Sequence, residues 1–279
     1  NTVTATGDTA KAAEAMAARL RAGGFAEGDV QVFSPAPRKG NLVARLRGSG
    51  ARKPVLLVAH IDVVPANRED WSVDPLKLIE QDGYFYARGS SDDKYMAAAF
   101  VTNLIRYKKE GYKPDRDIIL ALETDEEILD RDGLGIQWLL KNKRDLIDAE
   151  FALNEGGGGR TDGKGTVVAQ SLHVGEKTVG NYRIEATNPG GHSSIPVRDN
   201  AIYELSDALG KLRDFEFPVM LNDTTRAFFS KLGAARDDEV GKAMLAVVAN
   251  PQDKAAVAVL DKDRSFHSML RTTCVATML

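Results

Sequence analysis

The fold is decided by residues 55–62, Val-Leu-Leu-Val-Ala-His-Ile-Asp, in which five apolar residues lead directly into a histidine. A continuous apolar run of this kind is typical of a strand that is buried on both faces of a parallel sheet. Residues two apart in an extended segment face the same side, so Asp62 can reach toward the His60 imidazole. The stretch predicts a central strand with polar side chains at its end, where α/β folds place their chemistry.

Three later stretches place acidic side chains in the same way, after short apolar runs. Their sequences are Gly-Ser-Ser-Asp-Asp-Lys at residues 89–94, Leu-Ala-Leu-Glu-Thr-Asp-Glu-Glu at residues 120–127 and Phe-Ala-Leu-Asn-Glu at residues 151–155. Histidine, aspartate and glutamate are the ligands that a hydrolytic metal site needs. Chance loops rarely place such residues at successive strand ends, so the stretches together predict a metal centre that none of them predicts alone.

Helices and strands are expected to alternate through the first part of the chain, as the spacing of apolar and turn residues indicates. The expected helices cover residues 8–23, 95–109 and 134–142, and the expected strands cover residues 30–33, 41–46, 55–59, 84–87, 117–122 and 149–153. Of these strands, 55–59, 117–122 and 149–153 have the apolar character of strands buried on both faces. The order predicts an α/β fold in which a parallel-rich sheet is flanked by helices.

The pattern changes near residue 175. Residues 180–186 alternate like a half-exposed strand, and residues 199–212 have the pattern of an amphipathic helix. Residues 223–250 are helix-rich and residues 268–278 are strand-like. This block is therefore expected to be an α+β domain that follows the α/β unit.

The overall composition is that of an ordinary globular chain. The 279 residues are 43% hydrophobic and 28% charged, and 37 basic against 40 acidic residues give no support for a nucleic-acid surface. No apolar run approaches the roughly 20 residues of a membrane helix, so no membrane partner is expected. The single cysteine, Cys274, allows no internal disulfide, which fits the cytosol or a bacterial periplasm and leaves the compartment open.

The residues of the first two motifs each have a metal-site interpretation and a plainer alternative. His60 is expected to bind a metal while Asp62 orients it, since a ligand histidine commonly has a carboxylate partner that fixes its tautomer. The alternative is a structural histidine beside a turn aspartate. Asp92 is expected to bridge two cations at a loop-to-helix junction. The alternative is that Asp92, or its neighbour Asp93, caps the helix that follows.

The neighbouring carboxylates of Glu126 and Glu127 repel each other unless a cation or a proton intervenes. A metal bound to one of them would leave the other to act as general base on a water whose pKa a zinc ion lowers to about 7. The alternative is a solvated acidic loop, because six acidic residues fall within residues 123–132. Glu155, which precedes four glycines, is either a further ligand or an ordinary charged loop residue.

Together the motifs resemble those of the dinuclear zinc peptidase family that contains glutamate carboxypeptidase, Gly-X carboxypeptidase, aminoacylase and succinyl-diaminopimelate desuccinylase. They occur in the family's order, as Ala-His-Ile-Asp-Val-Val-Pro from residue 59, Trp71 with Asp74-Pro75, Arg-Gly-Ser-Ser-Asp-Asp-Lys from residue 88, Asp-Glu-Glu from residue 125 and Asn-Glu-Gly-Gly from residue 154. The resemblance extends from about residue 10 to the C-terminus.

The resemblance implies a role for each matched residue. The ligands of two zinc ions, which cobalt or manganese could replace, would be His60, Asp92, Glu127 and Glu155. Asp92 would bridge the two ions, and Glu127 would bind the second of them. Glu126 would be the general base, with Asp62 as the carboxylate behind His60.

The resemblance also implies a division of the chain. Residues 1–177 would form the catalytic zinc-binding domain, and residues 178–279 would belong to an inserted lid and dimerisation domain. The motif Gly-Gly-His-Ser-Ser-Ile-Pro at residues 190–196 resembles the lid signature of the family. His192 would reach the active site of a partner subunit and help to hold the scissile carbonyl oxygen, so a homodimer through the lid is expected. The alternative is a structural histidine in a glycine-rich turn.

The family's fifth metal ligand is a histidine in the closing half of the catalytic domain. After the glutamate pair the chain has only His173, His192 and His267, and none of them matches that position. The closing half of the catalytic domain is therefore expected to lie outside this chain, with the lid truncated as well. In this form the chain would bind one metal or none.

The implied reaction is hydrolysis of an amide bond next to a free carboxylate, as in a carboxypeptidase or an N-acyl-amino-acid deacylase. Glu126 would assist attack by a metal-activated water on a small peptide or an N-acyl amino acid. Arg198 and Arg271 are candidates for holding the carboxylate, with an ordinary surface charge as the alternative. Other readings are a dinuclear aminopeptidase, or a truncated non-catalytic member that acts in dimerisation or binding. A phosphoesterase is disfavoured because no phosphate-cradling Gly-Lys-Ser/Thr motif accompanies the acids.

Overall fold

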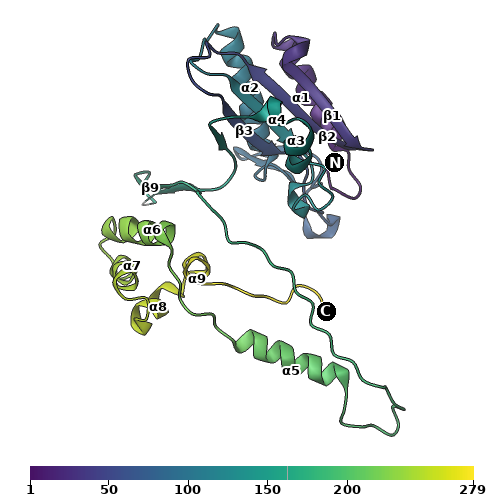
Figure 1. The fold of residues 1–279 in the computed structure, drawn as a ribbon, viewed down its shortest axis with the longest axis vertical. Helices are drawn as coiled ribbons and strands as arrows, with labels where there is room; N and C mark the ends of the chain where they lie inside the picture. The colour runs from purple at the N-terminus through teal and green to yellow at the C-terminus, as the bar shows by residue number, and fades with distance from the viewer. Residues whose placement is uncertain (162) are drawn as a thin grey trace. The chain divides into compact units, whose positions relative to one another are not determined.

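A computed structural model describes residues 1–161 and 163–279 of the chain. The chain divides into two compact units, unit 1 (Asn1–Glu155) and unit 2 (Gly156–Leu279), whose helices and strands are labelled in Figure 1. The predicted boundary between a catalytic domain and a lid, at residues 177 and 178, is a functional division and stays a prediction.

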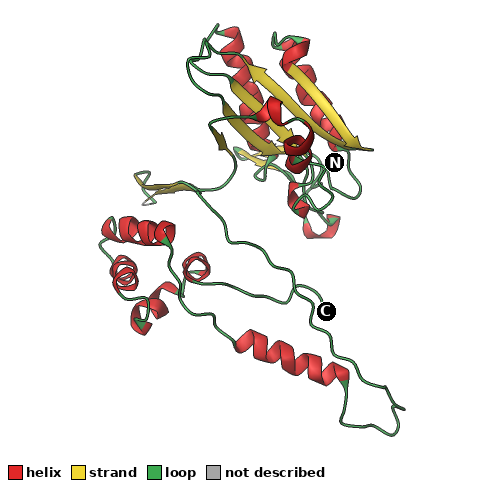
Figure 2. Cartoon of the chain, viewed as in Figure 1, coloured by secondary structure: helices red, strands yellow, loops and turns green. Residues whose placement is uncertain are grey.

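Unit 1 is built on a five-stranded mixed sheet (Figure 2). From one edge to the other its strands are β1 (Val30–Ala36), β2 (Lys39–Leu46), β6 (Ile118–Glu123), β3 (Val55–His60) and β7 (Phe151–Leu153). β6, β3 and β7 pair in parallel, whereas β2 is antiparallel to both of its neighbours. Every strand of this sheet except β2 therefore runs in the same direction, and the predicted parallel-rich sheet is confirmed.

Helices cover both faces of this sheet. They are α1 (Thr9–Ala22), α2 (Lys94–Lys109), α3 (Ile136–Asn142) and α4 (Arg144–Ile147). α1 and α2 share a core with Leu120 and Leu122 of β6, whereas α3 and α4 pack with Ile119 and Ala121 of the same strand. Side chains alternate in direction along a strand, so these two pairs of helices lie on opposite faces. β6 is buried on both faces, as its apolar sequence predicts.

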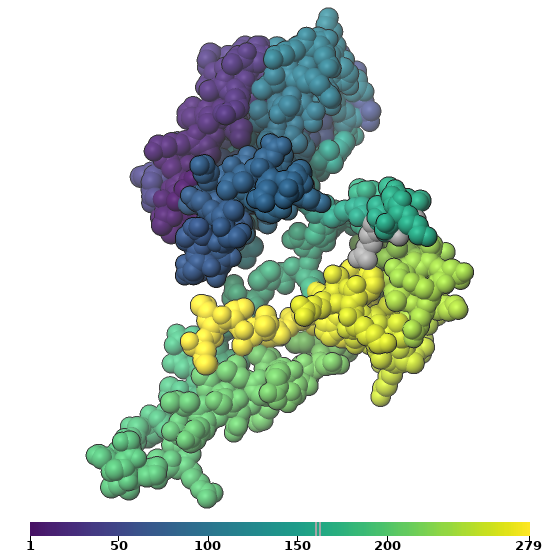
Figure 3. All heavy atoms as spheres, turned by 180° about the vertical axis from the view of Figure 1, so that it is seen from behind, coloured from purple at the N-terminus to yellow at the C-terminus, as the bar shows by residue number. Residues whose placement is uncertain are grey.

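The sequence also predicts where α1 begins and where one hairpin turns. Asp8 caps α1 by accepting a hydrogen bond from the Lys11 backbone N–H. The strand predicted at residues 84–87 is β5 (Tyr84–Tyr86), which pairs with β4 (Ile79–Gln81) across the Asp82-Gly83 turn. This hairpin belongs to the chain between β3 and α2, drawn in blue in Figure 3, and all three residues of β5 are exposed.

The prediction that residues 149–153 form a strand buried on both faces is wrong in its burial. The strand exists as β7, but Phe151 is 49% exposed and Leu153 is 50% exposed. β7 lies at the edge of the sheet, and among the described residues it pairs with β3 alone, through Val55, Leu56 and Leu57. An apolar run shows that a strand is favoured, whereas its burial depends on neighbours that the run itself does not specify.

Unit 2 contains a hairpin and helices. Its elements are β8 (Gly158–Thr161), β9 (Val167–Ser171), α5 (Ala201–Asp214), α6 (Asp223–Ala234), α7 (Glu239–Ala249), α8 (Lys254–Leu260) and α9 (Arg264–Leu270). A core that includes Phe229, Met244 and Leu260 joins α6, α7, α8 and α9. The predicted helices of residues 199–212 and 223–250 are confirmed in type. In the described part of the chain no helix combines the length and the apolar character needed to cross a membrane.

Two strand predictions in unit 2 are wrong. Residues 172–192 include the predicted strand 180–186 but form neither helix nor strand. The predicted strand 268–278 begins inside α9, because Asp263 caps that helix by accepting hydrogen bonds from the Ser265 and Phe266 N–H groups. A strand needs a neighbour to pair with its N–H and C=O groups, and none of the described residues pairs with either segment.

Candidate metal centre

The parallel neighbours β3 and β6 end side by side, at the carboxyl ends of the parallel strands. The two loops that follow them carry much of the predicted site. His60, the last residue of β3, is in register with Glu123, the last residue of β6. The pairing continues one residue further, because the Ile61 N–H donates to the Glu123 carbonyl oxygen at 2.9 Å. The loops that begin at Ile61 and Thr124 therefore start side by side.

His60 is 2% exposed, and each of its ring nitrogens has polar neighbours. Nδ1 lies 3.1 Å from the carbonyl oxygen of Asp62 and 3.6 Å from its Oδ1. On the other side of the ring, Nε2 lies 2.8 Å from Asp92 Oδ1. Asp62 thus lies where it could orient the ring, and its role stays a prediction. If a cation replaced the proton on Nε2, the ring would be neutral and would donate from Nδ1.

Further carboxylates approach the same nitrogen. Glu155 Oε1 lies 3.8 Å and Glu126 Oε2 lies 3.9 Å from His60 Nε2. One ligand atom from each of His60, Asp92 and Glu155 lies within 4.8 Å of the other two, so this group could hold a metal ion. The structure therefore brings four of the predicted residues together around Nε2.

The electrostatics of this cluster favour a bound cation. Burial by itself would lower the pKa of His60, but hydrogen bonds with Asp62 and Asp92 and the charge of Glu155 raise it to about 10. Burial raises the pKa of Glu126, the positive charge of His60 opposes this rise, and Glu155 adds to it. Both pKa shifts reflect carboxylates that lie close together in a partly buried site. A divalent cation would offset the repulsion between these carboxylates.

Asp93 is a member of this neighbourhood whose environment the sequence does not reveal. Its side chain is buried, and its Oδ2 has no hydrogen-bond partner among the described residues. Burial, followed by the charge of Glu155, raises the pKa of Asp93 to about 7. Asp93 occupies the N-cap position of α2 without making a capping side-chain bond, while Asp92 contacts His60, so neither of them caps α2 as the plainer reading supposed. A buried oxygen without a partner beside the ligand cluster fits a nearby cation.

The acidic stretch of residues 123–132 is not a solvated loop. Glu123, Asp125 and Asp130 are buried. Glu123 Oε2 accepts from the Ile136 N–H at 2.6 Å, and Asp130 Oδ1 accepts from the Leu134 N–H at 2.6 Å, so these two acids fix the start of α3. Burial, the largest effect, raises the pKa of Glu123 to about 8. The stretch therefore contains two acids that hold the backbone, Glu123 and Asp130, whereas the Glu126 carboxylate lies beside the cluster.

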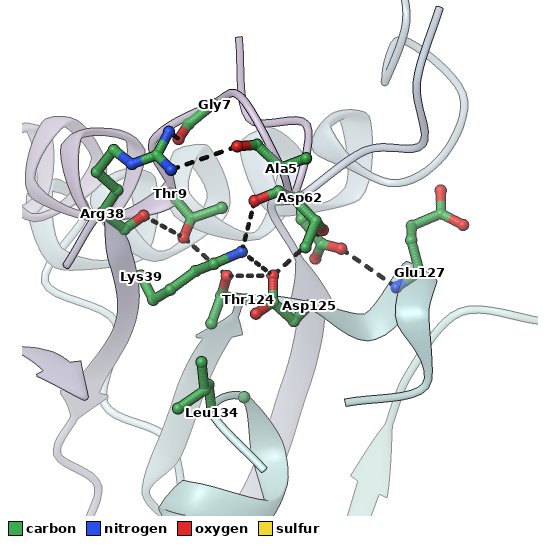
Figure 4. A network of polar contacts seen from close by, with 12 residues as sticks. Ala5, Gly7, Thr9, Arg38, Lys39, Asp62, Thr124, Asp125, Glu127 and Leu134 are labelled. Carbon is green, nitrogen blue, oxygen red and sulfur yellow. Dashed lines mark hydrogen bonds and ion pairs between the residues drawn. The ribbon is translucent and has the colours of Figure 1, made fainter. Parts of the chain in front are cut away.

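The remaining predicted residues stand apart from the cluster or await a test. The Glu127 N–H donates to Asp62 Oδ2 (Figure 4), and burial and the charge of Asp92 raise the pKa of the Glu127 side chain. Its role as ligand of a second ion stays a prediction. His192 belongs to unit 2, where its Nδ1 contacts the Ser194 hydroxyl at 2.7 Å. Its catalytic role likewise stays a prediction.

The two arginine candidates differ. Arg198 is exposed. Arg271 is buried, contrary to the reading as a surface charge, and its guanidinium contacts both carboxylate oxygens of Asp261, at 3.0 and 3.2 Å. The same group lies 2.6 Å from His267 Nδ1. The Asp261 ion pair already occupies the carboxylate-binding fork of Arg271, which favours a structural role within unit 2.

Comparison with known proteins assigns the chain to a family. Residues 56–261 match the model of peptidase family M20/M25/M40, and the chain belongs to that family. This confirms the resemblance drawn from the motifs, and the family implies a divalent metal, for which the cluster offers ligands.

The chain is also similar to individual known proteins over part of its length. The chain is 30% identical over 234 residues to the N-fatty-acyl-amino acid synthase/hydrolase PM20D1.1 of Danio rerio, covering 81% of this chain and 44% of that protein. It is 30% identical over 162 residues to aminoacylase-1 of Mus musculus, covering 58% of this chain and 38% of that protein. A solved structure, the M20 family metallo-carboxypeptidase Sso-CP2 from Sulfolobus solfataricus, has a TM-score of 0.46 and 21% identity over 56% of this chain and 34% of that one. The chain spans less than half the length of these relatives.

Replacing His60 tests the metal centre. We expect His60→Ala to weaken binding of a divalent metal by more than about a hundredfold, because it removes the nitrogen around which the carboxylates gather. Calorimetric titration of the metal-free protein with Zn²⁺ or Co²⁺ would measure the affinity and the stoichiometry. His173→Ala is the matched control, since it removes a half-exposed histidine of unit 2. Unchanged metal affinity in His60→Ala would contradict the assignment.

Proposed function

We propose that the protein is a metal-dependent hydrolase that cleaves an amide bond next to a free carboxylate. The observation that carries the proposal is the gathering of His60, Asp92 and Glu155 with Glu126 about one buried imidazole nitrogen. Membership of the M20/M25/M40 peptidase family supports hydrolysis, and the names of the zebrafish and mouse relatives support N-acyl amino acids as the substrate class. A small peptide with a free C-terminus offers the same chemical groups.

We assign two zinc ions to the complete enzyme, with cobalt or manganese as possible replacements. His60, Asp92 and Glu155 would hold the first ion, and Glu127 would bind the second, which Asp92 would share. When bound, the metal would polarise the scissile carbonyl and make water more acidic. Burial, followed by the charge of Asp92, raises the pKa of Glu127, and this effect of Asp92 on Glu127 supports a shared cation. The predicted fifth ligand is a histidine outside the matched positions of this chain.

Glu126 is the general base of the proposal. Its carboxylate takes a proton from the attacking water and later returns it to the leaving amine. A general base works best when its pKa lies near the working pH, and burial moves the pKa of Glu126 in that direction. Asp62 acts through its neighbours: it orients His60 from one side and holds the Glu126 backbone from the other.

His192 and the homodimer form the second part of the proposal. We assign His192 to the partner subunit's site, where its ring would donate a hydrogen bond to the oxygen of the scissile carbonyl. The exposed Gly-Gly-His-Ser-Ser turn and the contact of His192 Nδ1 with the Ser194 hydroxyl support this role. A hydrogen bond between the Ser194 hydroxyl and Nδ1, in either direction, can fix the tautomer of the His192 ring.

Substitution of the general base separates catalysis from metal binding. We expect Glu126→Gln in the full-length protein to lower kcat by more than about a thousandfold while the metal content stays unchanged, because the amide keeps the shape but cannot take a proton. Steady-state rates and metal analysis on the same sample would measure both quantities. Glu80→Gln, on the exposed strand β4, is the control. Loss of metal together with activity would assign Glu126 to the ligands instead.

A set of substrates tests the requirement for a free carboxylate. We expect the full-length protein to hydrolyse an N-acyl amino acid, and to lose at least roughly a hundredfold in kcat/KM when the same compound carries a carboxamide, because the groups that pair with the carboxylate would be left unpaired. A dipeptide amide with a free amine should not be cleaved. Preference for that last compound would instead identify an aminopeptidase.

Mixing two inactive variants tests whether His192 acts on the partner subunit. We expect His192→Ala and Glu126→Gln each to be inactive alone. After subunit exchange at equal amounts, half of the dimers are mixed and each has one complete site, so about a quarter of the wild-type rate should return. Sedimentation would confirm the dimer under the same conditions. A monomer at every concentration, or no recovery from proven mixed dimers, would reject this part of the proposal.

A further inference from the structure

The turn that carries Glu126 forms an ion pair with β2 that the proposed chemistry does not use: the buried Asp125 contacts Lys39. Asp125, directly before Glu126, has a left-handed backbone conformation with φ 67° and ψ 22°. Residues other than glycine adopt this conformation uncommonly, although aspartate does so more readily than most. The Asp125 side chain is 0% exposed, so its contacts with the protein hold the turn in this form.

The contacts of Asp125 converge on one oxygen (Figure 4). Its Oδ1 accepts hydrogen bonds from Lys39 Nζ at 2.6 Å and from the hydroxyls of Thr4 and Thr124, each at 3.2 Å. The Lys39 side chain is 14% exposed, and its Nζ also donates to the Thr4 carbonyl oxygen at 2.9 Å. A charge-assisted hydrogen bond shielded from water is stronger than a neutral one, so the bond from Lys39 is the strongest of the contacts that hold Asp125.

The N-terminal segment connects this turn to the loop that follows β3. Val3 forms a parallel bridge with Val63, and the Val63 N–H donates to the Thr2 carbonyl oxygen at 3.3 Å. Thr4, two residues further along the same segment, contacts both Asp125 and Lys39. Residues 2–4 therefore connect the loop that follows His60 to the turn that precedes Glu126.

Asp62 holds the same turn from the other side. Its Oδ1 accepts from the Glu126 N–H and its Oδ2 accepts from the Glu127 N–H, each at 3.2 Å. The position of the Glu126 carboxylate, 3.9 Å from His60 Nε2, thus depends on two sets of contacts, those of Asp125 and those of Asp62. A displacement of about 1 Å in a catalytic group can cost roughly a hundredfold in rate, so these contacts matter for turnover.

We propose that Lys39, acting through Asp125, is a positioning residue that sets where the Glu126 carboxylate lies relative to His60. The inference rests on the proposed role of Glu126 as general base. Lys39 is the first residue of β2, a strand that supplies none of the predicted ligands. The Lys39 ammonium group fixes the left-handed turn at Asp125, and that turn fixes the position of the Glu126 carboxylate.

The test uses Lys39→Met and the pair Lys39→Met/Asp125→Asn. The single change leaves the Asp125 charge buried without its cation, whereas the pair removes both charges and so keeps the experiment usable if the single variant does not fold. The matched control is Arg45→Met/Asp117→Asn, which removes a 2.8 Å ion pair near the other end of β2. Lys39→Arg keeps a cation and serves as the rescue variant.

The first readout is amide hydrogen exchange at the Glu126 and Glu127 N–H groups in the metal-free protein. We expect exchange at both amides to become at least about tenfold faster in either Lys39→Met variant, because their bonds to Asp62 open more often, and to stay unchanged in the control. Unchanged exchange in a folded variant, or equal acceleration in the control, would overturn the proposal.

The second readout is the steady-state rate of the metal-loaded, full-length protein. We expect kcat to fall by roughly a hundredfold with KM and metal content unchanged, and Lys39→Arg to recover part of the loss. A normal kcat in folded Lys39→Met/Asp125→Asn would overturn the proposal. If the wild-type protein hydrolyses no amide, the proposed function fails by itself, and the exchange experiment still decides whether Lys39 holds the turn.

Discussion

The candidate site depends on the Asp62 carboxylate, which is fully buried between the loops that follow β3 and β6. Its two oxygens accept the N–H groups of Glu126 and Glu127, and its backbone oxygen lies 3.1 Å from His60 Nδ1. A buried charge without partners would be strongly destabilising, and here backbone donors and an imidazole surround it. One aspartate therefore orients the histidine and places the glutamate pair at the same time.

The acids around it divide into two groups with opposite effects. Glu123 and Asp130 accept backbone N–H groups at the start of α3, and Asp125 pairs with Lys39, so their oxygens stabilise the loop after β6. Burial raises the pKa values of Glu126 and Glu127, and neighbouring negative charges add to the rise: Glu155 and Glu127 act on Glu126, and Asp92 acts on Glu127. Such a pair persists only because the surrounding structure fixes it, and a bound cation would relieve it.

Sequence patterns predicted the elements whose cause is local. The apolar run of residues 55–59 specified β3, the Asp8 cap specified α1, and the position of His60 directly after β3 specified the edge of the sheet that holds the cluster. The order of motifs predicted which acids gather at that edge, because parallel strands bring their carboxyl ends together.

The same patterns could not predict features that depend on distant partners. The exposure of β7 follows from its place at the edge of the sheet, and the absence of a strand at residues 180–186 follows from the lack of a pairing neighbour among the described residues. Lys39 and Asp125 are 86 residues apart in the chain. Nothing in the sequence around Lys39 marks it as part of the site, since an isolated lysine before a strand is usually a surface residue.

The division of the chain into units bears on how the proposed enzyme would work. The atoms that could hold the first metal all come from unit 1, between His60 and Glu155, and so do Asp62, Asp125 and the base Glu126. His192 comes from unit 2, where it sits in an exposed turn. Metal binding would therefore be a property of unit 1 by itself, whereas stabilisation of the reacting carbonyl oxygen would require a second element to be brought to it.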